Sequence, residues 1–173
     1  MAKGSDFERY VCKKLSVWFQ GTEKPYLFWR MPASGGLATI SEMNKGLAGD
    51  IIPLDEDIKK WWPLSIECKT GYPSTSFWQH FKGLKNFNIE LFWKQCTEDA
   101  KKSDKYPMLI YRKKGQKPIV GINEIVEDMF DIEHLPSISL YFPKTKDNVV
   151  FYDMEQFFNN ITPEQLKEQT WHK

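Results

Sequence analysis

The segment Leu64–Lys69 (LSIECK) constrains the fold of this chain most. It reads as a β-strand whose apolar and polar residues alternate: Leu64, Ile66 and Cys68 against Ser65, Glu67 and Lys69. The apolar set suits a hydrophobic core, but the other set brings a carboxylate and an ammonium group onto a strand that otherwise looks buried. Because an unpaired buried charge is costly, the strand must offer these groups a metal ion, a partner or a hydrated cleft.

The rest of the chain predicts an α/β layer structure around this strand. Apolar residues recur at helical spacing from Ser5 to about Gln20, and further helices are expected at about Lys85–Ser103 and Asn123–Phe130. Two acidic helical pieces are expected at the C-terminus, and Asp55–Lys60 reads as a charged connection. The other predicted strands are Tyr26–Arg30, Asp50–Leu54, Pro107–Arg112, Pro118–Ile122, Ser137–Phe142 and Val149–Tyr152.

Length and composition suit one folded domain. We expect it to span residues 1–173, with a core at about 3–122 and a C-terminal extension at about 123–173. Apolar residues make up 41% of the chain and aromatic residues 15%, which excludes a disordered polymer. No apolar run approaches the ~20 residues that cross a bilayer. The N-terminus lacks the apolar segment of a secretory signal, and the three cysteines are widely spaced. We therefore expect an intracellular protein of the cytoplasm or nucleoid with no membrane partner.

Charge is unevenly distributed along the chain, although the net value is only +1. Residues 1–122 hold 20 Lys and Arg against 13 Asp and Glu, whereas residues 123–173 hold 4 against 10. A basic first part can present a phosphate-binding face to a nucleic acid. Charge alone is equally consistent with a solvated helix face and a charged turn.

Glu67 and Lys69 form an E-x-K triplet, a spacing that is weak on its own. The same spacing occurs in two D-x-K triplets that we expect on the surface, Asp57-Ile58-Lys59 and Asp99-Ala100-Lys101. Glu67 differs because it lies on a buried strand and because Asp50 opens the preceding strand. Adjacent strands can bring the two carboxylates together, and their oxygens suit Mg²⁺, with Mn²⁺ as a plausible substitute. The alternative is a surface ion-pair ladder.

These residue types suit phosphodiester hydrolysis. That reaction needs an activated water and neutralisation of the charge that develops on the phosphate, and a bound metal ion can supply both. Lys69 could orient the water or stabilise the developing charge. The chain contains no Walker A loop, H-E-x-x-H, G-x-S-x-G or Gly-rich dinucleotide turn, which removes the commoner enzyme classes.

Glu8 is a further acidic candidate with two interpretations. On a helical wheel it falls inside the apolar stripe of the first predicted helix rather than on the hydrated face. However, Ser5-Asp6-Phe7-Glu8 also matches the S-x-x-E capping box, in which Glu8 would close the start of the helix. A helix start packed on the sheet can also face a metal ion, so both interpretations stay open.

Four segments together resemble the archaeal-type Holliday junction resolvases of the PD-(D/E)XK superfamily. They occur in the same order: Lys3–Leu15, Arg30–Gly36, Gly49-Asp50-Ile51 and Ile66–Lys69. The resemblance covers roughly Lys3 to Lys114 and implies a restriction-endonuclease-like core of αβββαβ order, with a central mixed sheet flanked by helices.

The resemblance also implies a site and a substrate. Glu8, Asp50, Glu67 and the backbone carbonyl of Cys68 would hold Mg²⁺, with Lys69 as the catalytic lysine and Ser34 near the scissile phosphate. The implied function is metal-dependent endonucleolytic cleavage of four-way or branched DNA by a homodimer. An origin in a phage, with the protein acting inside a host cell, would suit a resolvase of this size. The candidates for DNA contact are Arg30, Lys82, Lys85 and Lys94.

Three departures from the resolvase pattern leave other functions open. The acidic motif is Gly49-Asp50 rather than Pro-Asp, the loop Leu37–Ala48 is longer, and the segment after Gly115 has no counterpart. The alternatives are a related endonuclease for linear duplex, flap or RNA, and a binding module that does not cut. The aromatic residues between positions 77 and 93 either stack on nucleic acid or, as we favour, form core or a dimer interface.

Overall fold

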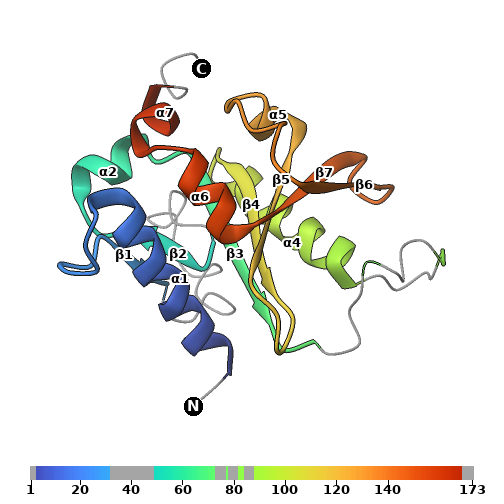
Figure 1. Cartoon of the computed structure of the whole chain (residues 1–173), viewed down its shortest axis with the longest axis horizontal. Helices are drawn as coiled ribbons and strands as arrows, with labels where there is room; N and C mark the ends of the chain where they lie inside the picture. Colours follow the sequence, from blue (N-terminus) through green and yellow to red (C-terminus); the bar gives the residue numbers. More distant parts are fainter. Residues whose placement is uncertain (1–2, 32–48, 73–76, 78–81, 84–87, 169–173) are drawn as a thin grey trace.

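The structure is a computed structural model that describes residues 3–31, 49–72, 77, 82–83 and 88–168. Its centre is a seven-stranded mixed sheet of order β1-β2-β3-β4-β5-β7-β6 (Figure 1). Only β3 and β4 pair in parallel; the other neighbours are antiparallel. The strands are β1 (Phe28–Arg30), β2 (Ile51–Pro53), β3 (Leu64–Thr70), β4 (Tyr106–Arg112), β5 (Ile119–Asn123), β6 (Ser137–Phe142) and β7 (Asp147–Asp153). This architecture confirms the predicted α/β, restriction-endonuclease-like core.

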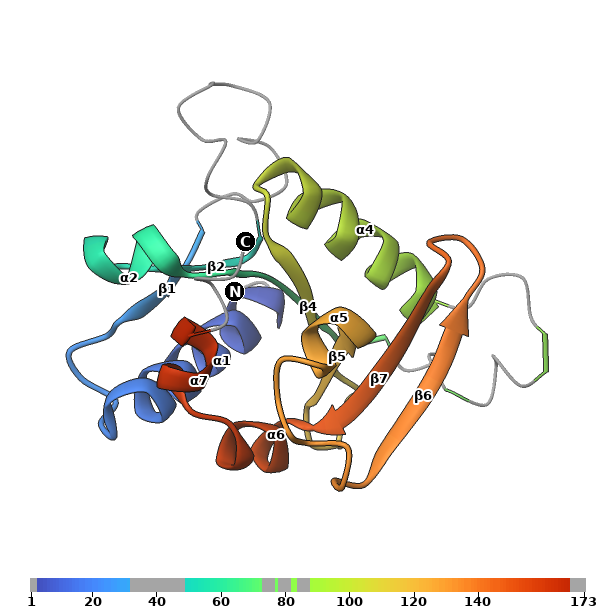
Figure 2. The same cartoon turned by 90° about the horizontal axis from the view of Figure 1, so that it is seen from above.

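Helices cover both faces of the sheet (Figure 2). One face carries α1 (Lys3–Gln20), and the same hydrophobic cluster takes in residues of four shorter helices: α2 (Glu56–Trp61), α5 (Glu124–Glu127), α6 (Met154–Asn160) and α7 (Pro163–Glu168). The opposite face carries α4 (Asn88–Lys102), whose buried residues form a second cluster with β4, β6 and β7. The core therefore has two layers, separated by the sheet.

Strand β3 lies inside the sheet and is buried on both faces, as its sequence predicts. Ile66 and Cys68 belong to the cluster on the α1 face. Lys69 points to the other face, where its Nζ atom lies 5.9 Å from the ring centroid of Phe92 on α4. The alternation expected from the sequence thus separates the core residues of β3 from its charged pair.

The charged connection Asp55–Lys60 joins β2 to β3 as predicted, but most of it forms the helix α2, which the sequence analysis did not predict. The Asp55 side chain caps this helix by accepting hydrogen bonds from the backbone N–H groups of Asp57 and Ile58, at 2.9 and 3.0 Å. Ile58 is its only buried residue, so the segment has no apolar stripe that periodicity could detect. The helix expected at Lys85–Ser103 is confirmed as Asn88–Lys102, with residues 84–87 outside the described part.

The C-terminal extension continues the sheet and the core of the first part. Strands β7 and β6 extend the sheet beyond β5, and Leu166 of α7 is fully buried in the cluster that contains Ile66. The Trp18 indole N–H of α1 donates to the carbonyl of Ile161 at 2.9 Å. On the other face, the Trp93 indole N–H of α4 donates to the carboxylate of Asp147 at 2.7 Å. Both helical layers are therefore joined to residues beyond position 122.

The three cysteines are free and buried, and they lie on three different elements: Cys12 in α1, Cys68 in β3 and Cys96 in α4. Burial raises the pKa of the Cys12 thiol to about 12, with Glu8 adding to the effect. None of the helices within the described ranges has both the length and the apolarity to cross a bilayer.

Candidate active site

Asp50 is fixed by backbone hydrogen bonds on both sides. Its N–H donates to the carbonyl of Ile66 at 2.7 Å, and its carbonyl accepts from the N–H of Met31 at 2.8 Å. Its side chain is 6% exposed, and Oδ2 accepts from the backbone N–H of Cys68 at 2.8 Å. The carboxylate is therefore held against β3 at the position that the sequence predicts.

Gly49 explains why the motif here is Gly-Asp rather than Pro-Asp. Its φ angle is +100°, whereas proline is locked near about −65°. A Cβ atom on residue 49 would lie 2.9 Å from the carbonyl oxygen of Ile66 and 3.0 Å from its nitrogen. The close approach of this backbone to β3 thus requires glycine, and it is the same approach that positions Asp50.

Glu67 and Lys69 form a buried ion pair on the α4 face of β3. Glu67 is 3% exposed, and burial raises its pKa to about 7, helped by the nearby Asp50 carboxylate and opposed by Lys69. Burial disfavours the charged form of Lys69, but the Glu67 and Asp50 carboxylates outweigh it and raise the Lys69 pKa. Lys69 is therefore a cation near neutral pH, suited to stabilising negative charge rather than to accepting a proton.

Glu8 approaches the same centre from α1. Its Oε2 atom pairs with the guanidinium of Arg30 at 3.2 Å, with side-chain exposures of 17% and 29%. Burial raises the pKa of Glu8, and Asp50 is the second cause. The capping-box interpretation is wrong, because α1 begins at Lys3 and places Ser5 inside the helix. Asp50 is thus the common electrostatic neighbour of Glu8 and Glu67.

These residues fit a divalent cation by their chemistry. The Asp50 carboxylate acts on the carboxyl groups of both Glu8 and Glu67, and the pKa values of those two groups are raised. Carboxylate oxygens suit Mg²⁺ or Mn²⁺. In the present arrangement Glu67 pairs with Lys69, and Glu8 pairs with Arg30. As the side chains lie, the described residues contain no group of three His, Cys, Asp or Glu that could hold a metal ion. A bound cation would take over part of the neutralisation that the two basic side chains now provide.

The other predicted site residues have mixed outcomes. Ser34 and Lys85 lie outside the described residues. Lys82 is exposed, and Lys94 pairs with Glu98 on the surface of α4 at 3.7 Å. Arg30 pairs with Glu8, so its charge is already directed at the acidic centre. A role in DNA contact stays a prediction for all of them.

The aromatic residues between positions 77 and 93 are part of the core where the structure describes them. Phe92 and Trp93 are buried in the cluster under α4, as favoured from the sequence. Phe77 packs against that cluster, with its ring centroid 5.2 Å from that of Phe151. Trp78, Phe81 and Phe87 lie outside the described residues.

Arg112 is a neighbour of the site that the sequence analysis named only as the last residue of the predicted strand Pro107–Arg112. Its guanidinium lies 4.4 Å from the ring centroid of Phe7, the residue next to Glu8. It is the register partner of Thr70 on β3, one residue beyond Lys69. The sequence places Arg112 at the end of a predicted strand, but its proximity to Lys69 and Glu8 becomes clear only from the parallel register of β4 with β3.

The two D-x-K triplets lie on helices; Asp57 is exposed, as predicted, whereas only 24% of the Asp99 side chain is exposed. Asp57-Ile58-Lys59 lies on α2 and Asp99-Ala100-Lys101 on α4. Asp57 and Asp99 pair with lysines three residues along their own helices, Lys60 and Lys102, both at 2.7 Å. Glu67-Cys68-Lys69 is therefore distinguished from both D-x-K triplets by its location on a β-strand.

Comparison with known proteins gives a family. Neither the curated proteins nor the solved structures contain a significant match to this chain. A family described as "Phage putative PDDEXK endonuclease" matches residues 1–168, which is nearly the whole chain. The match includes Asp50, Glu67 and Lys69, the residues that the geometry brings together. The chain thus belongs to this phage family of PDDEXK endonucleases, within the PD-(D/E)XK superfamily.

Proposed function

We propose that this chain is a metal-dependent endonuclease that hydrolyses phosphodiester bonds of DNA at the acidic centre of β3. The single observation that carries the proposal is the buried pair of Glu67 and Lys69 beside Asp50. A core strand that keeps two charged groups under helix α4 has a stability cost, and a catalytic role explains why they are there. Family membership supports nuclease chemistry in general.

Each group has a proposed role. Asp50 and Glu67 bind Mg²⁺, or Mn²⁺ in its place, with Glu8 and the backbone carbonyl of Cys68 as further oxygen donors. The bound ion would supply an activated water and neutralise charge on the phosphate. Lys69, whose raised pKa keeps it protonated, stabilises the negative charge that develops on the phosphate oxygens. Ser34 is proposed to lie near the scissile phosphate.

The proposed substrate is branched or four-way junction DNA, cut by a homodimer inside a host cell. The support is the ordered set of motifs around Glu8, Ser34, Asp50, Glu67 and Lys69. Arg30, Lys82, Lys85 and Lys94 are proposed to contact the DNA backbone. Linear duplex, flaps and RNA remain alternative substrates of the same chemistry, and a non-cutting module of the same fold is the alternative from another class.

The test compares a labelled synthetic four-way junction with its linear duplex arms, each with and without Mg²⁺. We expect Mg²⁺-dependent paired nicks in the junction alone. Lys69→Ala and Asp50→Ala should each lower the cleavage rate at least a hundredfold, as removal of transition-state stabilisation typically does. Lys101→Ala is the matched control, because it removes a lysine of the same D/E-x-K spacing from the exposed face of α4.

Each alternative function predicts a different outcome of this test. Cutting of the linear arms at the same rate would keep the nuclease and discard the preference for junctions. Unchanged cleavage by Lys69→Ala and Asp50→Ala would overturn the assigned site. Retained DNA binding by the parent without cleavage in Mg²⁺ or Mn²⁺ would favour the non-cutting module.

A further inference from the structure

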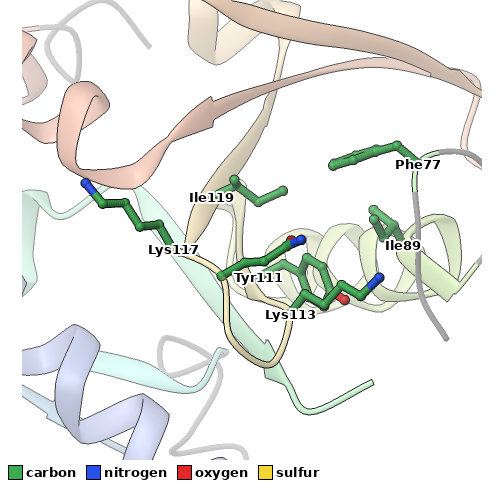
Figure 3. A pocket seen from close by; sticks show the side chains of 7 residues that line it. Phe77, Ile89, Tyr111, Lys113, Lys117 and Ile119 are labelled. Carbon is green, nitrogen blue, oxygen red and sulfur yellow. The ribbon is translucent and has the colours of Figure 1, made fainter. Parts of the chain in front are cut away.

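A hollow of about 180 Å³ lies on the α4 face of the sheet. Its walls are apolar, formed by Phe77, Ile89 of α4 and Ile119 of β5, with Tyr111 of β4 between them. Figure 3 shows these side chains turned toward a common space. Lys113 and Gln116, from the turn that joins β4 and β5, line the rim. The hollow thus combines an apolar interior with a polar, basic edge.

The hollow is adjacent to the acidic centre. Tyr111 is the register partner of Lys69 in the parallel pairing of β4 with β3. Paired residues on neighbouring strands are separated by about 4.8 Å and share a face of the sheet. Successive nucleotides of one DNA strand are separated by about 3.4 Å along the helix axis. A DNA strand with a phosphate at Lys69 therefore passes close to this hollow.

Size and lining suit a single ring system. The volume exceeds the roughly 150 Å³ of an engineered apolar cavity that binds benzene, and is below the roughly 300 Å³ at which pockets for larger ligands begin. A nucleobase has apolar faces for such walls and polar edges for a rim like that of Gln116. Aromatic side chains such as Phe77 bind unstacked bases without strong sequence preference.

The rim also offers a cation for the flanking phosphate. Lys113 lines the hollow and forms no ion pair with any residue that the structure describes. Lys117 also lines the hollow, but its side chain extends away from Tyr111 (Figure 3) and pairs with Glu155 of α6 at 3.3 Å. Of these two lysines, Lys113 is the one placed to contact a nucleotide held in the hollow.

We propose that this hollow binds one unpaired base of the DNA strand that is cut, with Lys113 at the phosphate next to that base. The inference rests on the proposed function, because it assumes that the strand passes Lys69. Extracting a base from a duplex has an energetic cost that is smallest where the base is already unpaired. The hollow would therefore direct the enzyme to bulges, branch points and frayed ends.

The test measures binding of fluorescein-labelled duplexes by anisotropy, with Ca²⁺ in place of Mg²⁺. One duplex is fully paired and the other has a one-base bulge. We expect the parent to bind the bulged duplex about tenfold more tightly, within the range of base stacking on aromatic side chains. Gln116→Trp, which fills the rim, should abolish this preference and leave affinity for the paired duplex unchanged. Gln116→Ala, which removes the same amide without filling the hollow, should reduce the preference less than Gln116→Trp does, because the apolar walls remain open to the base.

A second pair of variants tests the cation. Lys113→Ala should weaken binding of the bulged duplex severalfold more than Lys114→Ala, which removes the same charge from an exposed position of the same turn. Equal affinity of the parent for both duplexes, or a preference that survives Gln116→Trp, would overturn the base site. If the parent still cut DNA in Mg²⁺ in that case, the nuclease proposal would stand. Failure of the parent to bind or cut any DNA would overturn both.

Discussion

At the scale of single residues, burial and the Asp50 carboxylate together set the charge state of the acidic centre. Burial is the larger cause of the raised pKa of both Glu8 and Glu67, Asp50 is the second cause for each, and the Glu67 pKa reaches about 7. A carboxyl group with a raised pKa in the folded state binds its proton more tightly there than in the unfolded chain. Its contribution to stability is therefore present below the unfolded value of 4.5 and is lost as pH rises through about 7.

The first prediction follows from that sign. In metal-free buffer, the melting temperature should fall between pH 5 and pH 8, because Glu67 ionises beside Asp50. One pKa unit corresponds to about 1.4 kcal/mol, so the effect is on the order of a few kcal/mol. Mg²⁺ should reverse the fall at pH 8 and have little effect at pH 5, where Glu67 is protonated. Thermal melts at both pH values check this, and an equal Mg²⁺ effect at both would contradict it.

Replacing Asp50 by Asn is the second prediction. The amide oxygen can still accept from the N–H of Cys68, but the repulsion with Glu67 and Glu8 disappears. We expect metal-free stability at pH 8 to rise by about 1 kcal/mol while Mg²⁺-dependent cleavage is lost. Chemical denaturation and the junction assay measure the two effects. A stable variant that still cuts would show that Asp50 is not required for the chemistry.

At the scale of elements, β3 carries both the core and the site, and its sequence predicts both. Alternation is strict in Leu64–Lys69, so the strand, its charged face and the proximity of Asp50 were all predictable. The ion pair between Glu8 and Arg30 was not, because the two residues are 22 positions apart and meet only when α1 packs on the sheet. Helix α2 was missed because it buries only Ile58, and capping by Asp55 offers a weaker signal than periodicity.

The prediction at the scale of elements concerns the close approach of Gly49 to β3. Gly49→Ala adds a Cβ atom within 3 Å of the Ile66 backbone and requires a residue other than glycine at a φ of +100°. We expect a loss of a few kcal/mol in unfolding free energy and a large fall in cleavage, because Asp50 is displaced. Gly115→Ala is the matched control, with a φ of +79° but no atom within 4 Å of the added Cβ. Equal stability and activity in the two variants would show that the close approach to β3 has no effect.

At the scale of the whole molecule, residues beyond 122 are needed to complete the sheet and both layers. Their acidic composition suggested an extension, and sequence patterns alone could not show that α7 packs into the same cluster as α1. Leu166 is fully buried there, and Trp18 contacts the carbonyl of Ile161. That the chain folds as one cooperative domain therefore stays a prediction, now with a direct test.

That test is Leu166→Ala. Loss of a fully buried leucine should lower the free energy of unfolding by about 2–5 kcal/mol. If the chain is one cooperative unit, the whole melting transition should shift to lower temperature while remaining single, with circular dichroism and tryptophan fluorescence coinciding. Leu54→Ala, at an exposed position, serves as the control. A second transition appearing at low temperature would instead show that the C-terminal part unfolds separately.

The distribution of the three thiols makes this chain its own probe of partial opening. Cys12 on α1, Cys68 on β3 and Cys96 on α4 belong to three different elements, and each is buried in the folded protein. Alkylating reagents should leave the native state unmodified, so any cysteine that reacts identifies the element that has been exposed. The order in which the three are modified at rising denaturant would report the sequence of opening events, without any engineered label.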